Sequence, residues 1–387
     1  MPQWGVVVNK LKAKDSKWDA RNYVMFAALV LIWIMFSIFT EGKFLLTRNI
    51  SNLTRQMAIV GIMGIGAVLV IITGNIDLSV GSVMGALGGL AAALHIWNGV
   101  GPYQTIFIVL VGGLMVGLVQ GTIVSYFNVP AFIVTLGGLL IFRGVLLGIT
   151  KGVSIAPFDQ AYILYGQAYI PPQFVWVLAL LSCVLLISLN VLRRRSRIRY
   201  KFEVRSMMRF ILVNVLSCAL ILAVALILND YRGMPVPVLI MLALVVIFTF
   251  VAEKTTFGRS IYAMGGNFEA AFYSGIKVKK NLVIVFMLNG LLAAIAGIIL
   301  SARLNAGTPS AGQNLELDAI AAAVIGGTSM TGGSGKVAGA ILGAFFMASI
   351  DNGMSMMNVD AYWQYIVKGI ILVSAVWFDI YSHKQAK

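Results

Sequence analysis

Apolar runs of membrane-spanning length, separated by short polar stretches, make up most of this 387-residue chain. A helix needs about 17–25 residues to cross a hydrocarbon core of about 30 Å, and eleven runs have that length. Backbone amides in lipid must find partners within their own segment, so we expect these runs to be α-helices. The expected spans are 23–40, 57–73, 78–97, 105–127, 131–150, 174–192, 210–228, 236–252, 281–300, 336–354 and 361–380.

A shorter apolar stretch decides how many times the chain crosses the membrane. The stretch 318–330, DAIAAAVIGGTSM, is short for a lone span, but neighbouring helices could shield it while it crosses. Counting it gives twelve crossings, which places the polar stretches 193–209 and 253–280 on the same side as both chain ends. We therefore predict an all-α polytopic membrane protein of about twelve transmembrane helices, ten in a core and two in an added pair over 174–228.

Basic residues cluster at the ends of the expected helices. Twenty of the 29 lysines and arginines lie before the first span, in 193–209, in 253–280 or at the end of the chain. Positive charge marks cytoplasmic helix ends, so we expect these stretches in the cytoplasm. Their placement explains the net charge of +15 without a nucleic-acid partner. The arginine-rich stretch 193–209, which we call the arginine linker, could also contact anionic lipid headgroups. Lys43, Arg48 and Arg55 would lie outside, against the rule.

These positions define the expected organisation. We expect a cytoplasmic N-terminal segment over 1–22, one transmembrane domain over 23–380 and a cytoplasmic tail over 381–387. The first span follows a long basic lead without a small-residue cleavage site, so we expect it to be a retained anchor. Within the domain, 253–280 is the expected cytoplasmic loop.

Composition narrows the class of protein. The chain is 59% hydrophobic and only 11% charged, whereas about a quarter of an ordinary soluble domain is charged. Its 40 glycines suit close approach between helices in a bilayer. Cys183 and Cys218 lie in apolar runs without ligand spacing, and His95 and His383 have no carboxylate cluster nearby, so we expect no metal site.

The sequence GGSGK at 332–336 invites comparison with a phosphate-binding loop. That loop requires Gly-x4-Gly-Lys-Ser/Thr after a strand, so that backbone amides surround the phosphates and the hydroxyl holds Mg²⁺. Here Met330 occupies the first glycine position and Val337 the hydroxyl position. No catalytic nucleophile–base motif is found elsewhere. We therefore expect no enzymatic activity and no bound cofactor in this chain.

The polar segment Glu253–Ile276, EKTTFGRSIYAMGGNFEAAFYSGI, interrupts the apolar pattern. It has small residues, the carboxylate of Glu269 and glycine breaks at Gly265, Gly266 and Gly275. This composition indicates a short surface helix presented to another protein.

Asp77 is the most informative single residue among the apolar runs. It lies in the break TGNIDLS, between Asn75 and Ser79 and just before the expected helix 78–97. A charge at mid-membrane costs about 2.5–3.5 kcal/mol, so such residues face a cavity or a polar partner. Asp77 could cap the following helix, where the helix dipole favours an anion, or line a translocation path together with Asn75 and Ser79.

A second polar stretch, 301–318, follows the ninth expected span. It contains Asn305, Glu316 and Asp318 among other polar residues. It could be an ordinary solvated loop, or the docking rim or vestibule for an uncharged, hydroxyl-rich solute.

Two segments far apart in the chain resemble each other. GSVMGALG (81–88) and GKVAGAILG (335–343) share Gly-x-Val-x-Gly-Ala, and each follows a polar, glycine-bearing break. Internal repeats with broken helices are common in transporters, because interrupted helices expose backbone groups to a cavity. Coincidence among glycine-rich helices is the alternative.

With these motifs in view, the chain resembles the permease subunits of bacterial ATP-binding-cassette importers for monosaccharides, and among them the D-xylose type. The blocks that carry the resemblance are GNIDLSVGSVMGALGG (74–89), VPAFIVTLGGLLIFRGVLLGIT (129–150), GRSIYAMGGNFEAAFYSGIKV (258–278), LSARLNAGTPSAG (300–312) and ELDAIAAAVIGGTSMTGGSGKVAGAILGAF (316–345). The xylose-type likeness rests on NDYRGMPVPVL (229–239), on 351–379 and on the extra pair over 174–228.

The resemblance implies partners and a coupling site. It implies a second permease copy, two ATPase subunits that use ATP and Mg²⁺, and an extracytoplasmic sugar-binding protein, in the bacterial inner membrane. The family's coupling segment, which contacts the ATPase, falls on Gly258, Arg259, Gly265, Gly266, Asn267, Glu269, Ala270 and Gly275. Phe272 and Tyr273 depart from the family pattern.

Three other classes of protein compete with this interpretation. A gradient-driven carrier would need several membrane carboxylates in relay, and the sequence offers Asp77, with Asp318 and Asp351 near helix ends. A membrane enzyme would need a nucleophile–base or metal constellation. A passive scaffold or channel would not require the segment 253–276.

Overall fold

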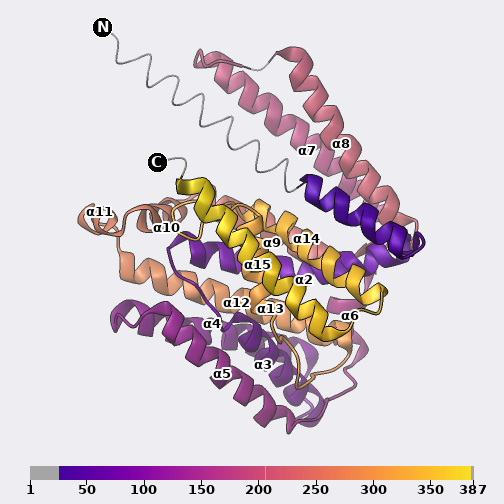
Figure 1. Cartoon of the computed structure of the whole chain (residues 1–387), viewed down its shortest axis with the longest axis vertical. Helices are drawn as coiled ribbons and strands as arrows, with labels where there is room; N and C mark the ends of the chain where they lie inside the picture. Colours follow the sequence, from indigo (N-terminus) through magenta and orange to yellow (C-terminus); the bar gives the residue numbers. More distant parts are fainter. Residues whose placement is uncertain (1–25, 205, 385–387) are drawn as a thin grey trace.

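The computed structural model describes residues 26–204 and 206–384, which are largely helical (Figure 1). The whole of the expected N-terminal segment, 1–22, and the last three residues of the expected tail, 385–387, therefore lie outside the described part. The helices are Phe26–Phe39, α2 (Thr47–Ile72), α3 (Val80–Ala92), α4 (Pro102–Tyr126), α5 (Ala131–Thr150), α6 (Gln160–Gln167), α7 (Pro172–Arg199), α8 (Met207–Asn229), α9 (Val236–Lys254), α10 (Thr256–Gly266), α11 (Phe268–Tyr273), α12 (Val278–Leu304), α13 (Leu315–Ile325), α14 (Val337–Met356) and α15 (Ala361–Lys384). A 3-10 turn (Lys43–Leu45), a π-helical turn (Ala93–Trp97) and the short strands β1 (Tyr169–Ile170) and β2 (Met234–Pro235) complete the fold.

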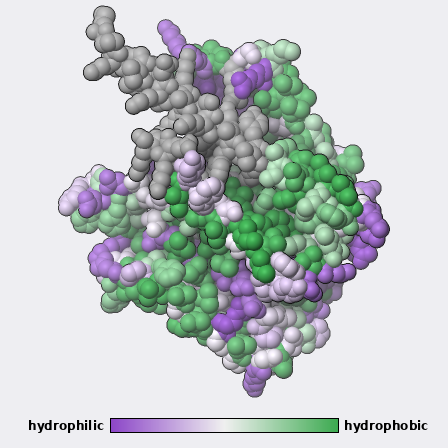
Figure 2. Space-filling model, viewed as in Figure 1, coloured by the Kyte–Doolittle hydropathy of each residue, from purple (hydrophilic) through white to green (hydrophobic). Residues whose placement is uncertain are grey.

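Ten helices in the described part are long and apolar enough to cross a membrane, as expected of a polytopic all-α protein. The span predicted at 131–150 coincides with α5, and most of the others differ at their ends. Hydrophobic side chains cover much of the visible surface, with hydrophilic ones at the top, along the left and right margins and in the lower centre (Figure 2). Such an apolar exterior suits a lipid environment.

The two remaining expected crossings are shorter. The first helix is described from Phe26 to Phe39, and α13 has 11 residues. At 1.5 Å per residue, α13 extends about 16 Å, roughly half of the hydrocarbon core. The stretch 318–330 therefore does not cross as one helix.

A non-helical stretch, made mostly of turns, lies before α13 and supplies the rest of this crossing. A Cβ on Gly307 would lie 2.5 Å from the Ala92 side chain, and one on Gly312 would lie 2.0 Å from the Gly81 carbonyl. Residues 305–314 thus run beside α3 from its last turn to its first. Non-helical backbone at membrane depth is tolerated where protein buries it, which corrects the expectation of a solvated loop at 301–318.

Glycines bring the central helices α4 and α12 into close contact. A Cβ on Gly113 would lie 2.4 Å from the Gly290 carbonyl, and one on Gly117 would lie 2.2 Å from the Phe286 carbonyl. Small residues are the usual means by which membrane helices approach closely. Together with α2, which is buried along most of its length, this pair forms the centre of the bundle.

The matched glycines of the internal repeat have the same packing role. A Cβ on Gly85 would lie 2.3 Å from the Ala311 carbonyl, and one on Gly339 would lie 2.0 Å from the Gly326 carbonyl. In both copies a helix that follows a polar break therefore packs tightly against another backbone segment. This shared function gives the sequence match a physical reason.

The two ends of the bundle differ. The α7–α8 connection, α10, α11 and the C-terminal end of α15 all lie toward the upper left of Figure 1, as expected for stretches that share one side. We call this the α10 end. At the opposite end Arg55 donates to the Tyr169 hydroxyl, and its guanidinium carbon lies 4.5 Å from the Tyr169 ring centroid. This contact accounts for a basic residue on the side where few were expected.

The added pair, α7 and α8, forms a hairpin that stands apart from the rest in Figure 1. It has its own small apolar cluster of Val175, Ala179 and Ala225, and Asn190 donates to Asn214 across the pair at 2.9 Å. Strands β1 and β2, which lie beside its ends, pair in antiparallel register, Tyr169 opposite Pro235. The hairpin is thus largely stabilised from within.

A buried group of charges joins the last three helices. The Lys368 ammonium on α15 lies 2.8 Å from a carboxylate oxygen of Asp318 on α13 and 2.8 Å from one of Asp351 on α14. The Asp318 side chain is 1% exposed and the Lys368 side chain 18% exposed. Breaking such a pair leaves an uncompensated charge away from water.

We expect Lys368→Met to destabilise the protein by about 3–5 kcal/mol, because two carboxylates lose their counter-charge. The measurement is the unfolding transition of the purified chain in detergent. Lys254→Met, at an exposed position, is the matched control and should change little. Equal stability of the two variants would show that the charge group does not hold these helices together.

Candidate functional site

Three segments distant in sequence meet at the α10 end. The amide of Gly333 donates to the carbonyl of Ile72, the last residue of α2, at 2.9 Å. A Cβ on Gly265, in α10, would lie 1.7 Å from the same carbonyl oxygen. Tyr262, one turn earlier, donates its hydroxyl to the Gly335 carbonyl at 2.7 Å. The expected coupling segment therefore packs directly on both polar breaks.

Tyr262 is suited to that contact as a donor. Burial raises the pKa of Tyr262 above its ordinary value, and the negative charge of Glu253 raises it further. The phenol therefore keeps its proton at physiological pH, and only the protonated phenol can donate to a carbonyl.

The segment predicted as one surface helix forms two short helices. The Thr255 hydroxyl caps α10 by accepting from Gly258 N at 3.0 Å, and Asn267 Oδ1 caps α11 by accepting from Ala270 N at 2.9 Å. Side-chain caps of this kind satisfy amides that have no partner in the first turn. Glu269 lies in the first turn of α11, where the helix dipole favours a carboxylate.

The predicted coupling residues fall into two groups. Gly258 and Gly265 face the body of the protein, since a Cβ on either would collide with backbone atoms. The second group faces outward and consists of Arg259, Gly266, Asn267, Glu269 and Ala270. Gly275 ends the segment with a φ of 80°, a conformation that favours glycine. The outward group is what a partner could touch.

Asp77 lies at the centre of the first break. Its Oδ1 accepts from the amide and the hydroxyl of Ser79, at 2.8 and 2.7 Å, and its Oδ2 accepts from Asn289 Nδ2 at 2.7 Å. The Ser79 hydroxyl in turn accepts from Gln120 Nε2 at 2.9 Å. These donors offset the cost of burying the carboxylate next to the first turn of α3. Asp77 thus binds the amide of Ser79, the residue before α3, which is the kind of contact that the capping alternative for Asp77 requires.

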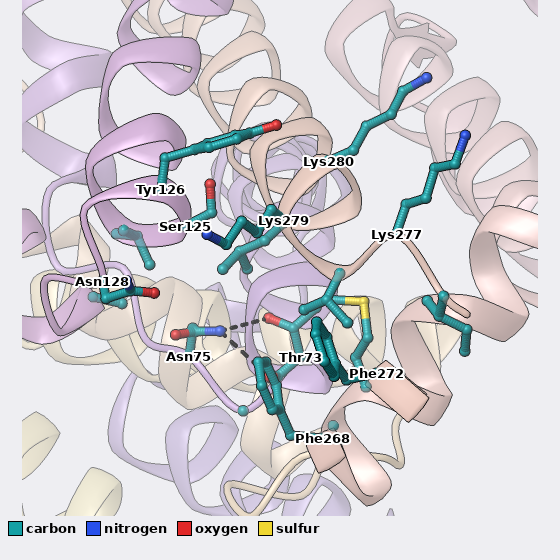
Figure 3. A pocket seen from close by; sticks show the side chains of 18 of the residues that line it. Thr73, Asn75, Ser125, Tyr126, Asn128, Phe268, Phe272, Lys277, Lys279 and Lys280 are labelled. Atoms are coloured by element: carbon teal, nitrogen blue, oxygen red, sulfur yellow. Dashed lines mark hydrogen bonds between the residues drawn. The ribbon is translucent and has the colours of Figure 1, made fainter. Parts of the chain in front are cut away.

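A cavity of about 1010 Å³ opens at this junction between α4, α11 and α12 (Figure 3). Asn75, from the first break, lies in its wall and donates to the carbonyl and the hydroxyl of Thr73 at 3.3 and 3.0 Å. Phe268 and Phe272 of α11 also line it. Of the predicted path residues, Asn75 is the one in this cavity wall.

The other predicted path residues lie away from the cavity. Asn305 directly follows α12, and its Oδ1 accepts from Phe158 N at 2.9 Å. Glu316, in the first turn of α13, has a buried side chain whose Oε2 has no hydrogen-bond partner among the described residues. That oxygen lies against Gly81, where a Cβ would be 2.0 Å away. Asp318 belongs to the charge group with Lys368.

Sequence analysis missed several polar residues inside the bundle. Asn289 and Gln120 complete the Asp77 network, and Gly66 leaves room for Asn289, since a Cβ there would lie 2.1 Å from its Oδ1. Arg143, on α5, donates to the Ala311 carbonyl at 3.2 Å. Each is a polar residue within a long apolar run, which was the available signal.

No group of three or more histidine, cysteine, aspartate or glutamate side chains suited to a metal ion occurs within residues 26–204 and 206–384. Cys183 is buried, and its Sγ lies 4.0 Å from the Cys218 carbonyl across the α7–α8 hairpin.

Comparison with known proteins identifies relatives along most of the chain. Residues 49–376 match the family described as branched-chain amino acid transport system / permease component. The chain is 49% identical to the xylose transport system permease protein XylH of Escherichia coli (strain K12), over 94% of this chain and 93% of that protein. Identity is 47% to XylH of Haemophilus influenzae, over 94% and 97%, and 33% to the ribose import permease protein RbsC of Bacillus subtilis (strain 168), over 92% and 91%. No solved structure matches.

We expect Gly265→Ala to destabilise the chain by about 1–3 kcal/mol, because the new methyl group would collide with the Ile72 carbonyl and displace α10 from the break. Gly266→Ala is the control, since nothing lies within 4 Å of a Cβ there. Unfolding of both variants in detergent is the measurement. If Gly265→Ala is as stable as Gly266→Ala, the contact is not tight.

Proposed function

We propose a function from the premise that the chain belongs to the family of branched-chain amino acid transport system permease components. In our proposal it is the membrane subunit of an ATP-driven importer of a monosaccharide in the bacterial inner membrane. ATP and Mg²⁺ act on separate ATPase subunits, and an extracytoplasmic sugar-binding protein delivers the solute. The observation that carries the proposal is the coupling segment packed on two polar breaks of the transmembrane bundle.

We propose D-xylose or a similar sugar as the solute. Two relatives named as xylose permeases are 49% and 47% identical to this chain, whereas those named for allose and ribose are 32% and 33% identical. The extra α7–α8 pair agrees with the xylose-type resemblance.

Coupling requires that the two transport states contact the ATPase differently, or ATP could bias neither of them. The outward residues of α10 and α11 would form that contact. On the inward side, Gly265 lies against Ile72, which directly precedes the first break. Tyr262 donates to Gly335, which lies in the second break. A displacement of α10 would therefore move both breaks together. We propose this as the route by which the ATPase acts on the path.

The proposed path runs between this chain and a second copy, with Asn75, Asp77, Ser79, Asn305, Glu316 and Asp318 as its candidate residues. Glu316 has the most support, because it is buried beside a non-helical stretch and has an unpartnered oxygen. Broken helices at membrane depth are typical of substrate sites in transporters. The basic stretches at the α10 end support a cytoplasmic location for that end and for both termini.

A gradient-driven sugar carrier is the alternative. The buried carboxylates Asp77, Glu316 and Asp318 are the observation in its favour, since proton and sodium carriers use such groups. The present pairing of Asp77 with neutral donors and of Asp318 with Lys368 leaves Glu316 as the unpaired member among the described residues.

The decisive test is uptake by proteoliposomes. We expect this chain to accumulate labelled D-xylose only when the ATPase, the binding protein and ATP are all present. Accumulation by the purified chain alone, under a proton or sodium gradient, would establish the carrier instead.

In the same assay we expect Glu269→Arg to reduce uptake and sugar-stimulated ATP hydrolysis at least tenfold, while membrane insertion stays normal. The substitution reverses a charge at the start of α11, on the surface proposed for the ATPase. Glu203→Arg makes the same charge change at an exposed position in the α7–α8 connection and should act like wild type. Full stimulation in the Glu269→Arg complex would remove this residue from the coupling surface.

A further inference from the structure

We propose that the cavity between α4, α11 and α12 binds the phosphate-bearing headgroup of an anionic phospholipid, with its acyl chains lying along the neighbouring helices. The inference rests on the proposed function in one respect, the assignment of this end of the bundle to the cytoplasmic leaflet. Lipid binding itself requires no ATPase.

The charged side chains that line the cavity are positive. Among the residues that the structure describes, the cavity lining includes Lys277, Lys279 and Lys280, at the start of α12, and no aspartate or glutamate. Glu269 lies nearby in α11 but is not among the lining residues. Basic side chains next to a membrane attract anionic lipid, each contributing about 1 kcal/mol. The lining thus favours an anion.

Hydrogen-bonding groups surround the same opening. Figure 3 shows Ser125, Tyr126 and Asn128, from the end of α4 and the turn after it, on one side of the cavity with Lys279 beside Ser125, while Lys277 and Lys280 lie on the other side with their ends directed outward. The Lys279 ammonium lies 5.5 Å from the Tyr126 ring centroid, which holds its charge near the opening. Hydroxyl and amide groups beside ammonium groups are suitable partners for phosphate oxygens.

Much of the remaining lining is apolar, and this part distinguishes a lipid from a free phosphate. Leu282 of α12, Val129 and Ala131 at the start of α5, and Phe268 and Phe272 of α11 form it. Phe132, Ile133 and Leu136 continue this apolar surface along α5, where they are exposed. An acyl chain would cover these side chains, whereas a small hydrophilic anion would leave them in contact with water.

Residues next to the cavity place it at the depth of lipid headgroups. Tyr126 and Phe127, where α4 ends, are 53% and 72% exposed. Tyrosine is enriched at the boundary between hydrocarbon and water, because its ring is apolar and its hydroxyl polar. Lysines at the start of a membrane helix extend toward the same boundary. The phosphate of a lipid could therefore bind in the cavity while it stays at its ordinary depth in the leaflet.

The position of the cavity gives such a lipid a consequence for coupling. Gly265, Gly266, Phe268 and Phe272 all lie in its wall, so a bound lipid would contact the proposed coupling segment. A ligand that fits one position of α11 better than another shifts the balance between them. Anionic lipid would therefore favour the transport state in which the cavity has this shape.

The test is a lipid titration of the whole chain, purified in detergent and followed by native mass spectrometry. We expect phosphatidylglycerol to bind at least tenfold more tightly than phosphatidylcholine. Replacing all three cavity lysines by glutamine (K277Q, K279Q, K280Q) should abolish that difference for one bound lipid. Replacing them by arginine should preserve it, which separates charge from any effect of the substitutions on folding.

The matched control removes the same charge from the arginine linker of the α7–α8 hairpin (R193Q, R195Q, R199Q) and should leave the tightly bound lipid in place. Equal loss in the control would mean that overall positive charge, rather than this cavity, attracts lipid. Full competition by inorganic phosphate would show that the apolar lining contributes nothing. Displacement of the lipid by the ATPase subunit would assign the cavity to the protein partner. Each of these three results would overturn the proposal.

Discussion

The need to satisfy every backbone polar group within lipid governs this structure. The chain breaks its helices at 73–79 and 326–336 and is non-helical over 305–314, all of which would be costly if exposed to hydrocarbon. Glycine removes the difficulty, because backbone segments can then approach closely enough to bury one another. The Ile72 carbonyl illustrates this: it accepts from Gly333 and lies against Gly265. The breaks, and the functions proposed for them, depend on such contacts.

Hydropathy predicted the fold class and most of the spans because lipid imposes a minimum length that a sequence displays directly. It predicted α5 at both ends, but it placed the start of α2 ten residues late, since the first turns of α2, Thr47–Thr54, are polar and only part of them, such as Ser51 and Thr54, is buried by protein. It also treated 301–318 as a loop. Nothing in the residues alone shows that Gly307 and Gly312 lie against α3.

The candidate site was predicted in outline and incompletely in detail. Asp77 and the coupling segment stood out because they are polar within apolar surroundings. Their partners did not: Asn289 lies 212 positions from Asp77, and Gly333 lies far from Ile72. Glu316 and Asp318, two positions apart, proved to have different surroundings: Glu316 Oε2 has no hydrogen-bond partner among the described residues, whereas Asp318 Oδ2 pairs with the Lys368 ammonium. Contacts between residues so far apart in the sequence follow from tertiary packing, which cannot be predicted from the identity of single residues.

The α7–α8 hairpin has an evolutionary consequence. Its apolar cluster and the bond between Asn190 and Asn214 lie within the pair, so an ancestral permease could acquire or lose the hairpin without repacking its centre. Selection could then change the hairpin's surface independently of the transport machinery. Changes confined to the hairpin would leave the contacts of the broken helices undisturbed.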